Sequence, residues 1–279
     1  MLFRSGKVLY KGHAVAAVAA ANPHQAEEAL ALIDVDYEVL TPVNNFREAM
    51  KEGTPLLHER LETLSDPGLR AGGYKSDEDT AMGSNVANHF EFRVGDVEKG
   101  FQEADVIVEK ETNTAAVHQG YIEPHTGTAM WQPDGSLTVW SSTQGHFNAR
   151  DLLSRLLNLP VSRIRVIPME IGGGFGAKGI LYSEPVAVLL AGKAGRPVKV
   201  TMSRTEVFEA SGPTSATNIK IKLGATNDGK LVAGEAHLIY ESGAFPGSPV
   251  PGGCNCIMGP YDIPNTYLEG LDVLVNHPK

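Results

Sequence analysis

Cysteine is scarce in this sequence. Among 279 residues there are two, Cys254 and Cys256, separated by a single residue. An iron–sulfur cluster is commonly held by four cysteine thiolates, so this chain cannot supply such a cluster by itself. We interpret both as ordinary thiols beside a glycine-rich loop. Any iron–sulfur centre of the functional assembly is therefore expected on another chain or another segment.

Basic residues are in the minority, and long apolar runs are missing. The chain has 24 Lys and Arg against 33 Asp and Glu, for a formal net charge of -9. Nucleic-acid binding requires clustered positive charge, so the balance argues against nucleic acid as the main partner. No apolar run approaches the roughly 18 residues of a membrane span, and the N-terminus lacks a signal-peptide pattern. The sequence predicts no membrane span and a cytoplasmic protein.

What is present suits a globular protein with a sizeable core. The hydrophobic fraction is 42% and the charged fraction 20%, which is typical of one large domain or two ordinary ones. Residues 6–20 are rich in Val and Ala and predict one or two strands. Asn22 and Pro23 then predict a helix cap with proline in the first turn, followed by a helix over 25–33. The alternation over 35–40 predicts a further strand, so a small α+β block ends near Pro42.

Residues 45–87 have weak periodicity and many turn-forming residues, among them Asp66-Pro67-Gly68 and Ala71-Gly72-Gly73. We interpret this stretch as a linker with a short helix and place a domain boundary in it. The alternative is a surface excursion within a single domain.

A second block of alternating strands and helices begins near His89. Helices are expected at 96–101, 148–157 and 183–191, and strands at 104–111, 128–131, 137–140, 163–168 and 197–202. A hairpin is expected between 219–224 and 231–240 around Asn227-Asp228-Gly229. Residues 243–265, rich in Gly and Pro, are expected to form a loop.

The most informative stretch is the glycine run at 171–179, between a predicted strand and a predicted helix. Gly174, Gly176 and Gly179 have the G-x-G-x-x-G spacing of a dinucleotide-binding turn. The acidic residue expected about 20 positions later for a ribose hydroxyl is missing, because Lys199 lies near that position. Such a run has a more general property: its backbone can lie flat against a ligand and point N–H groups at oxygens. The other interpretation is a tight structural turn.

Several motifs occur in a characteristic order around this run. They are Gln119-Gly120-Tyr121-Ile122-Glu123-Pro124, Ser142-Thr143-Gln144, Leu159-Pro160, Arg163-Ile164-Arg165-Val166 and Gly172-Gly173-Gly174-Phe175-Gly176-Ala177-Lys178. This order resembles the xanthine dehydrogenase/aldehyde oxidase family of molybdenum hydroxylases, in the large molybdopterin-binding subunit. Tyr10-Lys11-Gly12-His13 and Val35-Asp36-Tyr37-Glu38 extend the resemblance to the second half of that family's α/β hammerhead domain.

The resemblance implies an α+β fold in three segments. Residues 1–44 would be the C-terminal part of the hammerhead domain, 45–87 a linker, and 88–279 the N-terminal part of the molybdopterin-binding domain. It also implies that the chain is a fragment, inactive alone, because the family's catalytic glutamate would lie beyond Lys279. We therefore name no catalytic residue. Leu2-Phe3-Arg4-Ser5 matches the translation of a common library adapter, so whether residues 1–5 are native is an open question.

The resemblance also implies which residues contact the cofactor. They are Gly173, Gly174, Phe175 and Gly176, with the Phe175 N–H near an oxygen of the molybdenum centre. Gln144 would be an amide supporting the site, or alternatively a polar residue at a helix start.

Other polar residues near these motifs receive less specific roles. Gln119 does not match the register of the family's glutamine near the metal, and Glu123 is expected to be a structural carboxylate. We expect no metal role for His118 or His125, since this family holds molybdenum through pterin sulfurs.

Two departures bear on the substrate. Purine-oxidising members carry a glutamate where this chain has Gly179, and an arginine in the stretch that here reads Ser211-Gly212-Pro213-Thr214. Xanthine is therefore a poor expectation. Aldehydes, aromatic N-heterocycles, aromatic thioesters and carbon monoxide stay open.

By this resemblance the chain is a subunit of a hydroxylase that takes its oxygen from water. The implied cofactor is molybdenum-molybdopterin, in its cytosine dinucleotide form if the source is bacterial. [2Fe-2S] clusters and FAD would lie on an iron–sulfur subunit and an FAD subunit of a hetero-oligomer. Two alternatives are a non-catalytic cofactor-binding or scaffold protein that is complete as it stands, and a nicotinamide-binding enzyme.

Overall fold

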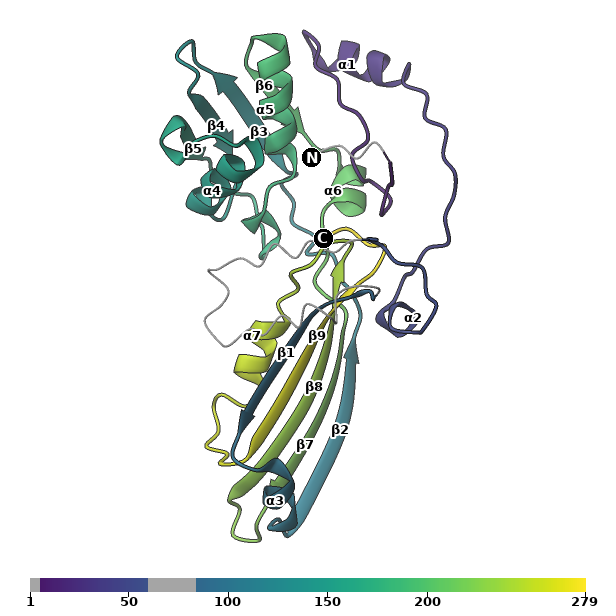
Figure 1. Ribbon diagram of the computed structural model, residues 1–279. Coiled ribbons are helices and arrows are strands. Elements are labelled where there is room, and N and C mark those ends of the chain that lie inside the picture. Colours follow the sequence, from purple (N-terminus) through teal and green to yellow (C-terminus); the bar gives the residue numbers. More distant parts are fainter. Residues whose placement is uncertain (1–5, 60–83) are drawn as a thin grey trace. The chain divides into compact units, whose positions relative to one another are not determined.

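The computed structural model describes residues 6–59 and 84–279, which form two compact units. Among the described residues, unit 1 comprises 6–40, His118–Pro213 and Pro278, and unit 2 comprises 41–59, 84–117, Thr214–His277 and Lys279. Figure 1 shows that each unit has a sheet of its own. Residues 1–5 and the glycine-rich part of the expected linker, 60–83, lie outside the described residues. The domain boundaries at 44 and 87 stay a prediction.

Unit 1 is built on a four-stranded sheet in the order β5-β4-β3-β6. Its strands are β3 (Thr126–Trp131), β4 (Leu137–Ser141), β5 (Ile164–Pro168) and β6 (Val198–Thr201). A tight turn joins β3 to β4, and these strands are antiparallel. The neighbouring strands β4 and β5 are parallel, so the chain must cross over between them.

Two helices bury one face of this sheet. They are α4 (His146–Leu157), which forms the crossover between β4 and β5, and α5 (Ser183–Ala194). Leu153 and Val188 on these helices are completely buried with Val139 of β4. The other members of this buried cluster are Ala129, Leu137, Ile164, Ala187 and Ala191. The sequence-based prediction of these helices and strands is confirmed, with ends shifted by one to three residues.

Unit 2 is built on a five-stranded sheet in the order β1-β9-β8-β7-β2. Its strands are β1 (Val86–Val94), β2 (Val106–Thr114), β7 (Thr217–Ala225), β8 (Leu231–Gly243) and β9 (Thr266–Leu274). The predicted hairpin is present as β7 and β8, with Gly229 at φ 87° in the turn. Strands β8 and β9 are parallel, and the connection between them contains helix α7 (Val250–Ile257).

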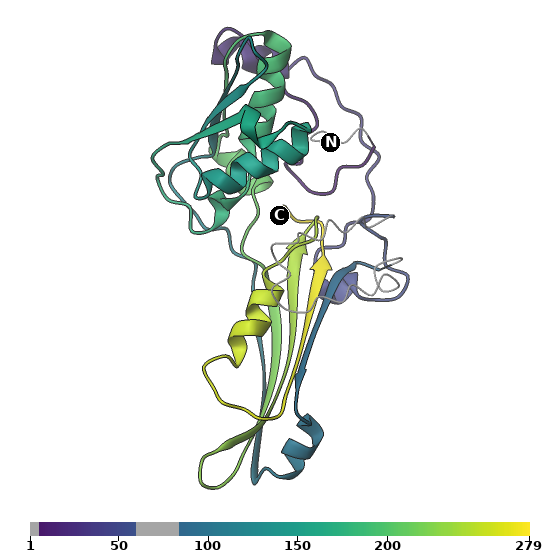
Figure 2. The same ribbon diagram turned by 60° about the vertical axis from the view of Figure 1, so that its left-hand side comes forward.

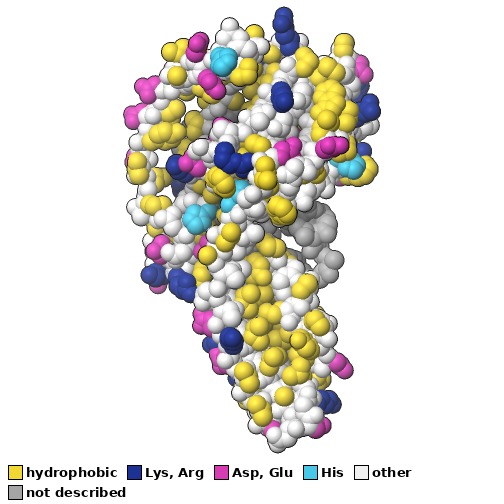
Figure 3. Space-filling view, turned by 180° about the vertical axis from the view of Figure 1, so that it is seen from behind, with side chains coloured by type: hydrophobic (Ala, Val, Ile, Leu, Met, Phe, Trp, Pro, Cys, Tyr) yellow, Lys and Arg dark blue, Asp and Glu magenta, His cyan; other side chains and the backbone are white. Residues whose placement is uncertain are grey.

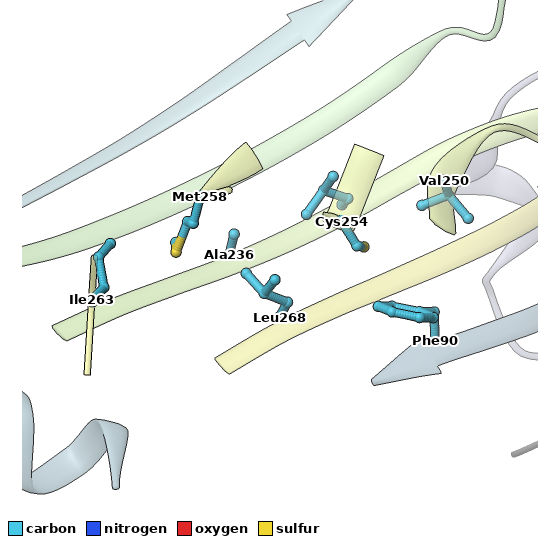
Figure 4. Packing of buried hydrophobic residues seen from close by; sticks show 8 residues of the cluster. Phe90, Ala236, Val250, Cys254, Met258, Ile263 and Leu268 are labelled. Atoms are coloured by element: carbon cyan, nitrogen blue, oxygen red, sulfur yellow. The ribbon is translucent and has the colours of Figure 1, made fainter. Parts of the chain in front are cut away.

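Helix α7 lies against one face of this sheet, as the turned view shows (Figure 2), and the hydrophobic core of unit 2 is packed between them. Val250 and Cys254 of α7 are completely buried against Ala236 and Leu268 of the sheet (Figure 4). Only glycine fits at position 270 of β9, because a Cβ there would lie 2.7 Å from the Cys254 sulfur. Seen from behind, unit 2 also shows a patch of hydrophobic side chains with charged side chains along its margins (Figure 3). The Cys254 and Cys256 thiols are both free.

Short helices complete the two units. In unit 1 these are α1 (Pro23–Leu30) and α6 (Arg204–Ala210), and in unit 2 α2 (Phe46–Ala49) and α3 (Val97–Gln102). The predicted start of α1 is confirmed, because the Asn22 side chain accepts a hydrogen bond from the Gln25 N–H. A side-chain oxygen at this position satisfies a donor that the first helical turn leaves free. No helix in the part of the chain that the structure describes is long and apolar enough to cross a membrane.

Three predictions of secondary structure are wrong. Segments 6–20 and 35–40 form no strand, although their alternation is strand-like. A strand needs a neighbour to satisfy its backbone groups, and no described segment pairs with either. In segment 35–40 the Val39 side chain is 90% exposed. Residues 243–265, expected to be a loop, contain α7, which its packing on the sheet stabilises.

Candidate functional site

The glycine run forms a turn in unit 1 between β5 and α5. Gly173 and Gly176 have φ values of 93° and 95°, which only glycine adopts readily. Phe175 also has a positive φ, 52°, and its side chain is 73% exposed. A bulky residue in this conformation is uncommon and marks a site where the surrounding structure imposes the backbone geometry. A single 3-10 turn, Ala177–Gly179, follows the run, and the predicted helix α5 begins at Ser183.

The strands around this turn are not ordered as in the dinucleotide fold. In that fold the strands before and after the helix are neighbours in a parallel sheet. Here β5 and β6 run in the same direction but lie at opposite edges of the sheet, and β6 pairs instead with the antiparallel strand β3. The G-x-G-x-x-G spacing therefore occurs outside the topology that gives it meaning.

The Gln144 side chain supports the turn from one side. Its Oε1 accepts hydrogen bonds from the Gly176 N–H at 3.1 Å and the Lys178 N–H at 3.0 Å. The Gln144 N–H donates to the Lys178 carbonyl at 2.9 Å. Gly174 packs against this amide so closely that a Cβ there would lie 2.7 Å from Oε1. Gln144 thus contacts the glycine run directly, whereas the sequence left its role open.

Glu123 supports the turn from the other side. Its Oε2 accepts from the Gly172 N–H at 2.6 Å and from Lys178 Nζ at 2.5 Å. Burial raises the pKa of this carboxyl, but the hydrogen bonds from Lys178 and Gly172 and the ammonium charge outweigh burial and leave the pKa below its ordinary value. Glu123 is therefore ionised at neutral pH, in line with the structural role expected for it.

The middle of the turn keeps its hydrogen-bond donors free. Within the described residues, the Gly173, Gly174 and Phe175 N–H groups have no acceptor, whereas the N–H groups of Gly172 and Gly176 on either side are bonded. Consecutive free N–H groups in a turn with positive φ values form an anion-binding concavity. A Cβ on Gly176 would meet nothing within 4 Å, so this part of the turn borders open space. These features fit a ligand that presents several oxygens, as the molybdenum centre and its pterin do.

A buried polar network packs behind the turn. The Tyr121 hydroxyl lies 2.7 Å from His125 Nε2 and 3.0 Å from Ser211 Oγ, and His118 Nε2 lies 3.0 Å from the same Ser211 oxygen. A Cβ on Gly173 would lie 3.2 Å from the Tyr121 Cβ, so the network and the turn are in contact. Burial, together with the nearby Lys178 charge, lowers the pKa of His125 to about 4. Both histidines are thus engaged with protein groups, and residues 6–59 and 84–279 contain no cluster of His, Cys, Asp and Glu suited to a metal ion.

The depressed pKa of His125 predicts a pH-dependent stability of unit 1. The folded state keeps His125 neutral down to pH about 4, whereas an unfolded histidine takes up a proton near pH 6.5. The contribution to the unfolding free energy is therefore complete above pH 6.5 and is lost as the pH falls towards 4, by at most about 3 kcal/mol. His125→Gln should flatten this slope. Urea unfolding followed by tryptophan fluorescence at several pH values measures it, and an unchanged slope in the variant would contradict the assignment.

Sequence reasoning did not single out two residues that shape this site. Lys178 stood inside the glycine motif, yet a lysine at a turn usually indicates a solvated charge, whereas its side chain is completely buried. Tyr121 stood between two noted residues and is 1% exposed. Gln119, which does not align with the glutamine that the family carries near the metal, has a buried Oε1 with no hydrogen-bond partner in the described part of the chain.

Comparison with known proteins places these features in a family. The model of the molybdopterin cofactor-binding domain matches residues 79–279. A probable xanthine dehydrogenase subunit of Bacillus subtilis (strain 168) is 32% identical over 274 residues, 97% of this chain and 34% of that protein. The nicotinate dehydrogenase large molybdopterin subunit of Eubacterium barkeri is 32% identical over 98% of this chain and 59% of that protein.

The fold agrees with these matches. Quinoline 2-oxidoreductase from Pseudomonas putida 86 superimposes with a TM-score of 0.80 at 24% identity, over 99% of this chain and 34% of that one. This chain spans between a third and three fifths of the length of these relatives. Because the family model covers well over half of the chain, the protein belongs to the molybdopterin cofactor-binding domain family of xanthine dehydrogenase/aldehyde oxidase-type molybdenum hydroxylases.

Proposed function

We propose that this chain binds the molybdenum-molybdopterin cofactor of a hydroxylase, with the glycine turn as a contact surface. The observation that carries the proposal is the row of three free N–H groups at Gly173, Gly174 and Phe175. In this proposal these groups donate to oxygens of the cofactor, and the open space at Gly176 admits it. Gln144 keeps the turn in shape through the two N–H groups that its Oε1 accepts.

The bound cofactor would supply the redox chemistry, the hydroxylation of a substrate carbon with oxygen from water. The chain's own contribution is to bind and orient. The free N–H groups favour negative charge beside the turn, and Phe175 offers an exposed aromatic wall. No residue of this chain is proposed as the general base.

The proposed substrates are aldehydes or aromatic heterocycles rather than purines. Gly179 provides no carboxylate where purine-oxidising members carry one, and a Cβ there would meet nothing within 4 Å. In the other stretch, Ser211 binds Tyr121 and the Val207 carbonyl instead of offering a cation. The relative named for nicotinate, an aromatic heterocycle, is consistent with this class.

The proposed partners are an iron–sulfur subunit and an FAD subunit in a cytoplasmic hetero-oligomer, with the cytosine dinucleotide form of the cofactor if the source is bacterial. Support comes from relatives named as subunits or chains of larger enzymes. Sequencing the genomic locus tests this part. Neighbouring genes for iron–sulfur and flavin subunits are expected, and their absence together with failure to co-purify such chains would contradict it.

The cofactor proposal predicts that the full chain retains molybdenum and pterin when it is produced in a host that makes the cofactor. Elemental analysis and pterin fluorescence measure both per chain, and about one of each is expected. Molybdate serves as a second probe, because an oxyanion should shift the amide resonances of Gly173, Gly174 and Phe175 in a ¹H–¹⁵N spectrum. A folded chain that retains no molybdenum and shows no shift at these amides would refute the proposal.

A further inference from the structure

One carboxylate oxygen holds both ends of the glycine turn. Glu123 Oε2 takes a hydrogen bond from the Gly172 N–H at the start of the turn and from Lys178 Nζ at its end. The Glu123 N–H also donates to the Gly172 carbonyl at 3.1 Å, so Gly172 is held by both of its backbone groups. Only glycine fits at position 172, because a Cβ there would lie 2.6 Å from the Glu123 Cβ.

Both the backbone and the side chain of Lys178 are held by hydrogen bonds. Its N–H donates to Gln144, its carbonyl accepts from Gln144 and Thr143, and its ammonium group reaches Glu123. The Lys178 side chain is 0% exposed, whereas that of Glu123 is 31% exposed. The ammonium group also lies over the face of the Tyr121 ring, with 5.3 Å between Nζ and the ring centroid.

Stability alone does not account for such a lysine. A buried ammonium group loses its hydration, and an apolar side chain of similar size is often equal or better for stability. What an ion pair adds is a specific geometry, because the carboxylate must stay where both donors reach it. In this turn that geometry ties Gly172 and Lys178 to the same carboxylate oxygen. The carbonyls of both residues accept from groups outside the turn, and neither accepts from the donors between them.

We propose that Glu123 and Lys178 are a positioning pair, which holds the turn so that the Gly173, Gly174 and Phe175 N–H groups stay available to the cofactor. The inference rests on the proposed function for the identity of the ligand, but the ordering of the turn can be measured without any ligand. Neither residue is proposed to touch the reacting atoms.

Hydrogen exchange in the full chain tests the pair directly. Lys178→Met leaves the Glu123 carboxylate without its cation and should loosen its hold on Gly172. Exchange at the backbone amides of positions 172, 176 and 178 is expected to accelerate about 10- to 100-fold, the range set by losing a hydrogen bond to a charged group. Glu123→Gln should accelerate the Gly172 amide as well, because a neutral acceptor replaces a charged one.

The matched control is the ion pair between Lys11 and Glu209. It belongs to the same unit and has the same length, 2.5 Å, but the Lys11 side chain is 82% exposed. Lys11→Met should leave exchange in the turn unchanged. If Lys178→Met also accelerates exchange at the amides of α4 and α5, unit 1 has unfolded in that variant. Lys178→Gln, which keeps a donor for Glu123, then takes the place of Lys178→Met in the test.

Cofactor retention provides the second readout. Supporting residues around a metal site change its affinity about 10- to 100-fold when they are replaced, so both variants should lose molybdenum by that factor while Lys11→Met keeps it. Turn exchange that stays at the wild-type rate in the folded variants of Lys178 and Glu123 would overturn the positioning role. If exchange in the turn accelerates in these variants but the wild-type chain retains no molybdenum, the positioning role stands and the proposed function is refuted.

Discussion

Replacing Gly174 with alanine should remove most cofactor binding and leave the fold intact. The new Cβ would lie 2.7 Å from Gln144 Oε1 and 2.8 Å from Gln144 Cδ, closer than any real Cβ contact. The end of the glutamine side chain can move, so the strain is relieved by displacing the amide. That displacement breaks the hydrogen bonds to Gly176 and Lys178, and the turn loses one of its two supports.

The expected size of this effect is a 10- to 100-fold weaker retention of molybdenum, about the loss produced by other supporting residues around metal sites. Molybdenum and pterin per chain, measured after production in a cofactor-making host, give this number. Circular dichroism and the amide spectrum check that the fold is unchanged.

Gly179→Ala is the matched control for this experiment. Gly179 lies five residues further along the same loop, and a Cβ there would meet nothing within 4 Å. Because its backbone φ is not positive, alanine should be tolerated, with a small gain in stability from the restricted unfolded chain. Equal molybdenum retention in the two variants would show that the Gly174–Gln144 contact does not shape the cofactor site.

Leu153→Ala should strongly destabilise unit 1. Leu153 is 0% exposed and belongs to the cluster between α4, α5 and the four-stranded sheet. Truncation removes apolar contacts and leaves a cavity that the surrounding side chains fill only partly. A loss of about 2 to 5 kcal/mol in the unfolding free energy is expected.

Tryptophan fluorescence isolates this unit in a urea titration. The chain has two tryptophans, Trp131 in β3 and Trp140 in β4, and both lie in the sheet of unit 1. Leu156→Ala is the control on the same helix, since Leu156 is 43% exposed and surface substitutions usually change stability by about 0.5 kcal/mol or less. Similar losses of unfolding free energy in the two variants would mean that α4 does not bury the face that carries Leu153.

Much of the local structure could be predicted from the sequence. The alternation at 128–131 and 137–140 with a glycine turn between them predicted β3 and β4, and helical spacing after 148 predicted α4. These features depend on periodicity and turn chemistry within a few residues, and both are written in the sequence itself. The glycine run was likewise recognised as a candidate site, because consecutive residues without a Cβ allow the backbone to lie close to a ligand.

Other elements depend on partners that lie far away in the sequence. Strands β1 and β9 were not predicted, and they pair with each other across a separation such as His89 to Leu271. Conversely, residues 35–40 have a strand-like pattern but no neighbouring strand in the described chain, and they stay extended without forming a sheet. A pattern can favour a strand, but only a second strand satisfies its backbone groups.

The same division holds at the candidate site. The sequence by itself determined that a flexible, glycine-rich backbone would be available at 172–176, and its motif order identified the family. Only the tertiary structure decided which side chains hold that backbone: Glu123 reaches Gly172 over 49 residues and Gln144 reaches Gly176 over 32. The physical reason is that a glycine run has no preferred shape of its own. Packing and hydrogen bonds from distant elements select one shape and leave three donors free for a ligand.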